Sequence, residues 1–167
     1  MFERFRQPDH SDQKWKKFEC DAVKQIIDTL EPLEWIVKTG HGGTYKFAGG
    51  AEVRYVDIHV AEPRQGGISF VIDAKHFKVA PLNRHELETT ENYRCRMRAT
   101  LAIVATSSTT KIPNSVWDKA AQMNRLLIMP VDRGFPCKLK KISRQLLGGR
   151  VIPPKNSASQ KWNFLVI

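Results

Sequence analysis

The sequence contains few cysteines and no long hydrophobic run. Its three cysteines, Cys20, Cys95 and Cys137, are far apart and form no CxxC pair, which argues against a disulfide framework and against zinc ligation. No apolar stretch approaches the roughly 20 residues that a membrane-spanning helix needs. The charged N-terminal stretch MFERFRQPDHSDQKWKK lacks the apolar segment of a secretion signal. We therefore expect a cytoplasmic protein with reduced cysteines and no membrane association.

Acidic residues are also in the minority. The 27 lysines and arginines outnumber the 17 aspartates and glutamates, and the formal net charge is +10. Such an excess on a small domain favours a polyanionic partner, and nucleic acid first, because neutralising phosphates releases counterions. A basic protein without such a partner is the alternative. An anionic membrane surface is less well supported, because no long amphipathic helix with a basic face is visible.

The spacing of apolar residues predicts an α/β fold, with a mixed β-sheet flanked by helices on both faces. Apolar positions that recur every three or four residues indicate helices, and continuous or alternating apolar runs indicate strands. The predicted helices span 11–31, 84–97 and a segment that begins at Asn114, and the predicted strands span 35–37, 53–60, 68–72, 101–105 and 126–131. The second and third strands are expected to form an antiparallel hairpin. The later strands alternate with helices, which favours parallel crossovers.

We expect a core domain at residues 1–132 and a basic C-terminal extension at 133–167. The last residues of the extension are apolar and include Trp162, Phe164, Leu165 and Ile167. Exposure of an apolar end of this kind to water is unfavourable. It is expected to pack on the core as an edge strand, or on a second subunit of a two-fold homodimer.

Charged residues end an otherwise apolar strand. Asp73 and Lys75 follow the apolar run at 68–72, and two residues apart on a strand they point to the same side. Asp57, in the preceding strand of the hairpin, would come alongside Asp73. Two converging carboxylates repel each other unless a cation lies between them, and Mg²⁺ prefers such oxygen ligands. A metal there would polarise a phosphodiester and lower the pKa of an attacking water, while Lys75 positions that water or stabilises charge on the phosphate. An isolated D-x-K triplet is also common as a surface ion pair, which remains the alternative.

These segments together resemble a known family of nucleases. VIDAK at 71–75, preceded by VDI at 56–58, resembles the core of the PD-(D/E)XK nuclease superfamily, and in particular its Mrr-like restriction endonuclease and archaeal Holliday-junction-resolvase branch. KKFECDAV at 16–23 is similar to the first helix of that branch, and AIVATSS at 102–108 to a later strand and its threonine-serine loop. WDKAA followed by LLIM resembles the last helix and strand. The likeness spans residues 11–132.

The resemblance implies a restriction-endonuclease-like αβββαβ core and a Mg²⁺-dependent DNA endonuclease, with Mn²⁺ as a substitute metal. It implies that Asp57 and Asp73 ligate the metal, that Lys75 is the catalytic lysine, and that Glu19 approaches the site from the first helix as a third ligand. The sequence departs from the branch in three ways: the middle acid is aspartate, no proline precedes Asp57, and GGAE at 49–52 stands where a glycine-aspartate-glycine cluster is expected. A structure-specific junction resolvase, an RNA nuclease and an inactive nucleic-acid-binding protein with the same fold remain alternatives.

Several residues have both a functional and a structural interpretation. Glu19 lies at the edge of the apolar stripe of its helix, where a glutamate is often only a solvated flank. The candidates for contact with nucleic acid lie after the D-x-K triplet, in a polar loop and in the basic extension. They are His76, Lys78, Lys111, Lys138, Lys140, Lys141 and Arg144. The basic extension is equally compatible with a solvated amphipathic helix, and the two interpretations can hold together.

Overall fold

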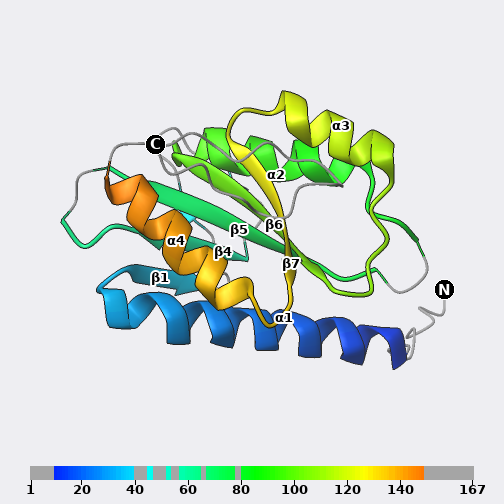
Figure 1. Ribbon diagram of the computed structural model, residues 1–167, viewed down its shortest axis with the longest axis horizontal. Helices are drawn as coiled ribbons and strands as arrows, with labels where there is room; N and C mark the ends of the chain where they lie inside the picture. The colour runs from blue at the N-terminus through cyan, green and yellow to red at the C-terminus, as the bar shows by residue number, and fades with distance from the viewer. Residues whose placement is uncertain are drawn as a thin grey trace, which may run out of the picture.

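The computed structural model describes residues 10–39, 45–46, 52–53, 57–64, 67–77 and 80–148. Within these ranges the chain forms four α-helices, one short 3-10 helix and seven strands (Figure 1). In chain order they are α1 (His10–Leu30), η1 (Glu31–Leu33), β1 (Ile36–Thr39), β2 (Tyr45–Lys46), β3 (Glu52–Val53), β4 (Ile58–Ala61), β5 (Ser69–Lys75), α2 (Arg84–Arg96), β6 (Leu101–Ser107), α3 (Asn114–Gln122), β7 (Leu126–Val131) and α4 (Phe135–Leu147).

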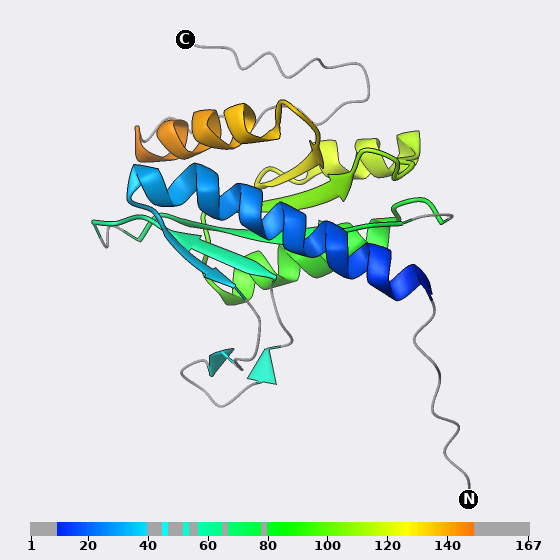
Figure 2. The same ribbon diagram turned by 90° about the horizontal axis from the view of Figure 1, so that it is seen from below.

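Five strands form one mixed sheet in the order β1-β4-β5-β6-β7. β1, β4 and β5 pair antiparallel, and Ile58 lies opposite Ile72. β5, β6 and β7 run parallel and are connected through α2 and α3. β2 and β3 form a separate two-stranded sheet (Figure 2). The order α1-β1-β4-β5-α2-β6 confirms the predicted α/β fold class and its αβββαβ core.

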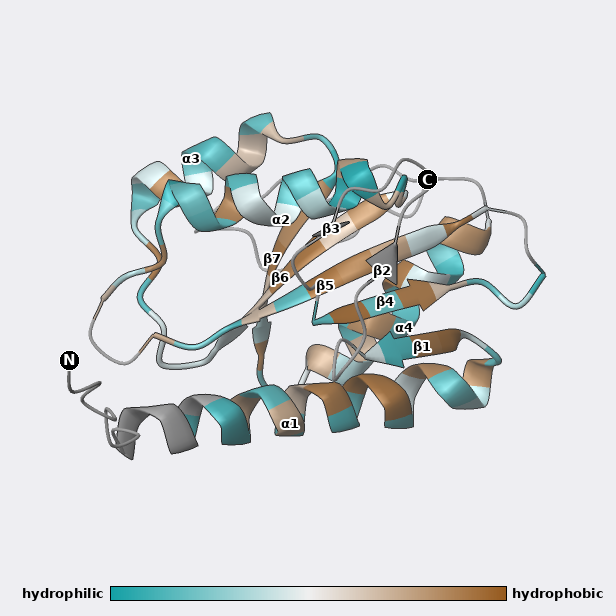
Figure 3. Cartoon of the chain, turned by 180° about the vertical axis from the view of Figure 1, so that it is seen from behind, coloured by the Kyte–Doolittle hydropathy of each residue, from teal (hydrophilic) through white to brown (hydrophobic). Residues whose placement is uncertain are grey.

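Helices cover both faces of the sheet, as predicted. α1 and α4 lie on one face and α2 lies on the other (Figure 2). Because successive strand residues point to opposite faces, the sheet contributes to two separate apolar cores. Phe70 and Ile72 belong to the core shared with α1 and α4, whereas Val71 belongs to the core shared with α2 and α3. Figure 3 shows the central strands as hydrophobic along most of their length.

α1 and α4 pack against each other and share one core. In α1, Ala22, Ile26 and Leu30 recur every four residues and are fully buried, as one stripe of an amphipathic helix requires. α4 contributes Phe135 and Leu139 to the same cluster. The beginning of the predicted extension therefore packs on the core, although a domain boundary at residue 132 stays a prediction. The apolar end that was expected to form an edge strand or a homodimer interface lies outside the described residues.

One strand was predicted with the wrong extent. The sequence predicted a continuous strand at 53–60, but β3 ends at Val53 and β4 begins at Ile58. Residues between them, at 54–56, lie outside the described ranges. Asp57 accepts a hydrogen bond from the Ala74 N–H at 2.7 Å through its side chain. If the antiparallel ladder continued, that N–H would bond to a backbone carbonyl of the neighbouring strand. The Asp57 side chain takes the place of this carbonyl, and the ladder of β4 with β5 ends at the pair Ile58–Ile72.

The remaining elements agree with the prediction more closely. α2 matches the helix predicted at 84–97 to within one residue. The strand predicted at 101–105 continues to Ser107, because Thr106 still pairs with Lys75 in the β5–β6 ladder. All three cysteines are free. In the part of the chain that the structure describes, no helix is long and apolar enough to cross a membrane.

Candidate active site

The carboxyl end of β5 carries Asp73 and Lys75 on the face that α2 covers. The Lys75 Nζ lies 3.1 Å from Asp73 Oδ2, as expected for two residues on the same side of a strand. Asp57 immediately precedes β4, and the pairing of Ile58 with Ile72 brings Asp57 beside Asp73. The structure thus brings together the three charged residues that the sequence singled out. They line one pocket of about 340 Å³, whose lining residues are Asp57, Asp73, Ala74, Lys75, His76, Phe77, Glu86 and Tyr93.

Asp57 and Asp73 form a close carboxyl pair. The Asp73 side chain is almost completely buried, with 5% of its surface exposed, and it hydrogen-bonds to the Asp57 carboxyl. Burial raises the pKa of Asp57 from 3.8 to about 8, and the Asp73 charge and hydrogen bond contribute in the same direction. The hydrogen bond from the Ala74 N–H opposes this shift, because it stabilises the ionised carboxylate. Without a cation, the Asp57 carboxyl therefore keeps its proton at pH values where an ordinary aspartate is ionised.

Lys75 lies between two carboxylates. Its Nζ is 2.9 Å from Glu86 Oε2, in addition to its contact with Asp73. Burial alone lowers the pKa of the Lys75 ammonium, but the charges of Asp73 and Glu86 outweigh it and raise the pKa above its ordinary value. Lys75 is therefore a protonated, partly buried ammonium that faces the pocket.

Sequence reasoning missed two residues of α2 that contact this site. Glu86 pairs with Lys75, and the Thr90 hydroxyl donates a hydrogen bond of 2.9 Å to Asp73 Oδ2. The side chain of Asn83 caps α2 by accepting a hydrogen bond from the Glu86 N–H, which fixes the first turn of the helix. A weak signal was present in the sequence, since Glu86 and Thr90 are four residues apart and therefore lie on the same side of a helix.

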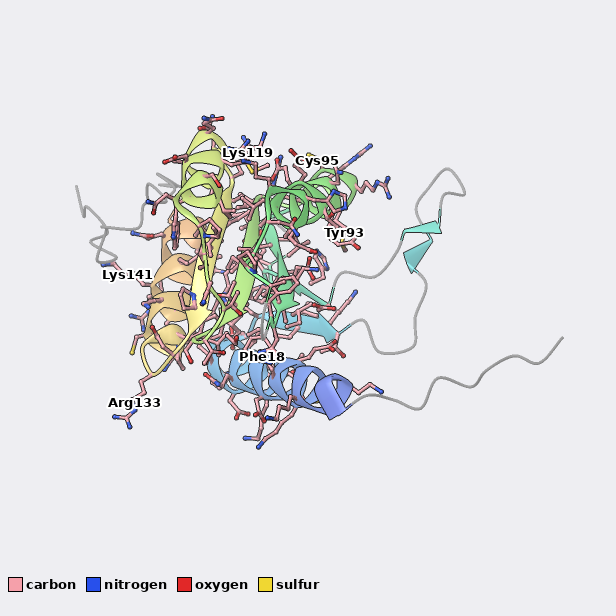
Figure 4. All side chains as sticks on the ribbon, turned by 90° about the vertical axis from the view of Figure 1, so that its right-hand side faces the viewer. Phe18, Tyr93, Cys95, Lys119, Arg133 and Lys141 are labelled. Carbon is pink, nitrogen blue, oxygen red and sulfur yellow. The ribbon has the colours of Figure 1, made fainter. Side chains whose placement is uncertain are left out.

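α1 reaches the edge of the site through consecutive residues. The ring of Phe18 stacks on His76, which lines the pocket, with 5.5 Å between ring centroids. Phe18 on α1 and Tyr93 on α2 lie on opposite sides of the sheet (Figure 4). The charge of Glu19 contributes to the raised pKa of Asp57, so this carboxylate acts on the site electrostatically. Metal ligation by Glu19 stays a prediction.

The donor groups fit a cation that needs few protein ligands. Among the described residues, no three histidine, cysteine, aspartate or glutamate side chains are grouped so that they could hold a metal ion. Asp57 and Asp73 nevertheless offer two adjoining carboxylates that repel each other when both are ionised. Mg²⁺ is commonly bound by one or two carboxylates together with water and substrate phosphate. The pair therefore suits Mg²⁺ and does not suit an ion that requires a complete protein cage.

The predicted nucleic-acid contacts lie in three different places. His76 lines the pocket, and Lys111 is exposed. Lys78 lies outside the described residues. The basic side chains of α4 belong to the layer on the other face of the sheet, and Lys138 pairs with Asp132 at 3.2 Å. Figure 4 shows Lys141 and Tyr93 on opposite sides of the molecule. A role of the α4 residues in binding nucleic acid, which the sequence suggested, stays a prediction.

Comparisons with known proteins give one structural similarity. No family model matches the sequence, and no curated protein sequence matches it. A structure described as MspJI restriction endonuclease in complex with a 27-mer oligonucleotide aligns with a TM-score of 0.42 and 11% sequence identity. The alignment covers 89% of this chain and 37% of the other, so this chain spans little more than a third of that enzyme's length. A similarity this distant carries no argument about activity, and the function must be argued from the site.

Proposed function

We propose that this chain is a Mg²⁺-dependent DNA endonuclease that hydrolyses phosphodiester bonds. The observation that carries the proposal is the convergence of Asp57, Asp73 and Lys75 on one pocket at the end of a buried strand. The net charge of +10 supports a polyanionic substrate. The sequence resemblance to the PD-(D/E)XK superfamily supports the same assignment for the same three residues.

The charges of the pocket explain why a cation is needed. With both aspartates ionised, three carboxylates outnumber the single ammonium, because Glu86 also lines the pocket. Such a pocket repels a phosphodiester. Asp57 and Asp73 would hold the Mg²⁺ and so remove this repulsion, and Mn²⁺ is expected to substitute. A bound Mg²⁺ supplies Lewis-acid polarisation of the phosphate and lowers the pKa of an attacking water.

Lys75 contributes a fixed positive charge. Its raised pKa keeps the ammonium protonated through the neutral range. A protonated lysine cannot accept a proton, so its role is to hold a phosphate oxygen and to stabilise the negative charge that develops in the transition state.

A cleavage assay tests the proposal. The purified chain is incubated with supercoiled plasmid, linear duplex and a four-way junction, each with Mg²⁺ and with EDTA. We expect Mg²⁺-dependent cleavage that Asp57→Asn, Asp73→Asn and Lys75→Ala each reduce by at least about 10²–10³-fold. Asp28→Asn is the control, because Asp28 is exposed and pairs only with Lys24 in the described contacts. Full activity in any of the three site variants would refute the assignment, and the best-cleaved substrate distinguishes a duplex endonuclease from a junction resolvase.

Binding of nucleic acid without cleavage is the second candidate, and the basic composition favours it independently of the site. A chain of this kind would bind duplex with a strong dependence on salt but would leave every substrate intact with Mg²⁺ or Mn²⁺. An RNA substrate in the same assay addresses the remaining alternative of an RNA nuclease.

A further inference from the structure

Two residues of α2 contact the charged end of β5 but belong to no part of the assignment above. Glu86 and Thr90 lie one helical turn apart on the side of α2 that faces the sheet. Thr90 is fully buried, and Glu86 lines the pocket. We call these two residues the α2 clamp. A buried hydroxyl such as that of Thr90 is costly unless it is hydrogen-bonded, and a partly buried carboxylate such as that of Glu86 is costly unless it is paired. The contacts of the two residues therefore indicate what they do.

The Thr90 hydroxyl orients the Asp73 carboxylate. Its Oγ1 lies 2.9 Å from Asp73 Oδ2 and also 2.9 Å from the backbone carbonyl of Glu86. A hydroxyl has one hydrogen, and a buried carboxylate is the stronger of the two acceptors. Lys75 contacts the same oxygen, Oδ2. These two contacts thus meet at one oxygen of Asp73 and hold it between α2 and Lys75.

Glu86 holds Lys75 independently of Asp73. Its contact with the ammonium, at 2.9 Å, is shorter than the 3.1 Å contact with Asp73. A carboxylate that is committed to a cation has less charge to offer a neighbouring ammonium. The Lys75 ammonium would then be held less strongly by Asp73, and the flexible side chain could turn toward solvent. The second anchor on α2 prevents this.

We infer that the α2 clamp positions two functional groups of β5. Thr90 orients the carboxylate of Asp73, the proposed metal ligand, and Glu86 keeps the ammonium of Lys75 in the pocket. The inference rests on the proposed function, because positioning matters only if Asp73 and Lys75 act. Glu86 and Thr90 are positioning residues rather than catalytic ones, since they act through their neighbours. A purely structural role for the same contacts would be to neutralise buried charge, and the experiments below separate the two.

The first experiment tests Thr90 with a matched neighbour. Thr90→Val keeps the shape but removes the hydroxyl, and Thr90→Ser keeps the hydroxyl but removes the methyl group. Thr89→Val is the control, because Thr89 makes the same helical contact, with the His85 carbonyl at 2.9 Å, but is only partly buried and does not line the pocket. Calorimetric titration with Mn²⁺ alone measures metal affinity without any need for cleavage. We expect about 10–100-fold weaker Mn²⁺ binding in Thr90→Val and near-normal binding in Thr90→Ser and Thr89→Val.

The second experiment tests Glu86. Glu86→Gln keeps the length of the side chain and removes its charge. Glu88→Gln is the matched control, because Glu88 lies on the same helix and pairs with Lys119 at 3.5 Å, outside the pocket. Hydrogen exchange of the Lys75 ammonium, followed by ¹⁵N NMR in metal-free protein, reports how firmly it is held. We expect several-fold faster exchange in Glu86→Gln and no change in Glu88→Gln.

Cleavage kinetics then link positioning to activity. In Glu86→Gln we expect kcat to fall by about 10–100-fold while KM for DNA stays nearly constant, because the lost interaction acts in the transition state. Thermal melting of each variant confirms that the fold is retained before kinetics are compared.

The outcomes separate failure of the clamp from failure of the proposed function. The clamp is overturned for Thr90 if Thr90→Ser loses as much Mn²⁺ affinity as Thr90→Val, because packing would then explain both. It is overturned for Glu86 if ammonium exchange and kcat match those of Glu88→Gln. If the wild-type chain neither binds Mn²⁺ nor cleaves any substrate, the proposed function fails and the clamp inference fails with it.

Discussion

The two faces of β5 are both almost completely buried, yet they carry different kinds of residue. Phe70 and Ile72 contact the core of α1 and α4 and are purely apolar. On the other face Val71 is followed by Asp73 and Lys75, which contact α2. The same seven-residue strand therefore presents a continuous apolar surface on one side and ends in a charged site on the other.

Burial has opposite consequences on these two faces. Removing apolar surface from water stabilises the fold by about 25 cal/mol per Å². Burying carboxyl groups penalises their charged form, which is why the pKa of Asp57 is raised to about 8. One face of the strand thus contributes stability, while the other keeps a carboxyl pair whose repulsion a cation can relieve.

The largest expected effect on stability is on the apolar face. Phe70→Ala removes a fully buried ring that packs edge-on against Trp35, with ring centroids 5.4 Å apart. We expect the free energy of unfolding to fall by about 3–5 kcal/mol, from lost burial and the cavity left behind. Urea denaturation measures it, and Leu147→Ala, at a position that is 46% exposed, is the control. A loss below about 1 kcal/mol would mean that this face contributes less than its burial implies.

The charged face should show its cost in the pH dependence of stability. The pKa of Asp57 is raised from 3.8 to about 8 in the folded chain. Between these two pH values the folded state therefore keeps a proton that the unfolded state has released. Wild-type stability should therefore decline relative to Asp57→Asn as pH rises from about 4 to about 8, by at most about 1.4 kcal/mol per pH unit. The difference should level off at higher pH.

Chemical denaturation of both proteins across this pH range measures the difference. Saturating Mg²⁺ should flatten it, because the cation takes the place of the proton on Asp57. Parallel pH profiles for the two proteins would show that Asp57 titrates as an ordinary exposed carboxyl group and that the contrast between the two faces of β5 is smaller than the geometry indicates.

The smallest expected effect concerns the outer surface of α4, which lies with α1 on the face of the sheet opposite α2. If its basic residues bind DNA, reversing Lys138, Lys140 and Lys141 to glutamate should weaken binding to all sequences. The slope of log K against log salt should flatten by about 0.9 for each lost phosphate contact. Lys24→Glu, on neighbouring α1, is the single-charge control. An unchanged slope would confine DNA contact to the pocket side of the sheet and sharpen the comparison.

The sequence predicted the core of the site because the relevant signals are local. Asp73 and Lys75 follow an apolar run, and the period of a strand places them on one side without any knowledge of the tertiary fold. Asp57 needed one further assumption, that the two strands pair as a hairpin, and the structure confirms that pairing. The start of β4 at Ile58 could not be predicted from the sequence. It depends on the Ala74 N–H, which bonds to the Asp57 side chain and not to a strand carbonyl.

Glu86 and Thr90 show where local reasoning ends. α2 is polar around most of its circumference, and its few apolar residues, such as Leu87, indicate the inward side only coarsely. That side is set by packing, in which Leu87 joins the core shared with α3. Thr90, four residues beyond Glu86, is then buried against Asp73. Only the rotation of the helix, which depends on tertiary contacts, identifies the pair.

The hydrogen bonding of β5 has a consequence for how this protein can change over time. Between Phe70 and Ile72 the strand is paired along both edges, antiparallel with β4 and parallel with β6. Its amide protons should therefore exchange with solvent only when the whole domain opens, like those of the most protected segments of other proteins. Asp73 and Lys75 continue directly from this doubly paired stretch and stay paired with β6. Insertions and substitutions in surface loops can therefore accumulate without altering the spacing of these two residues on the strand.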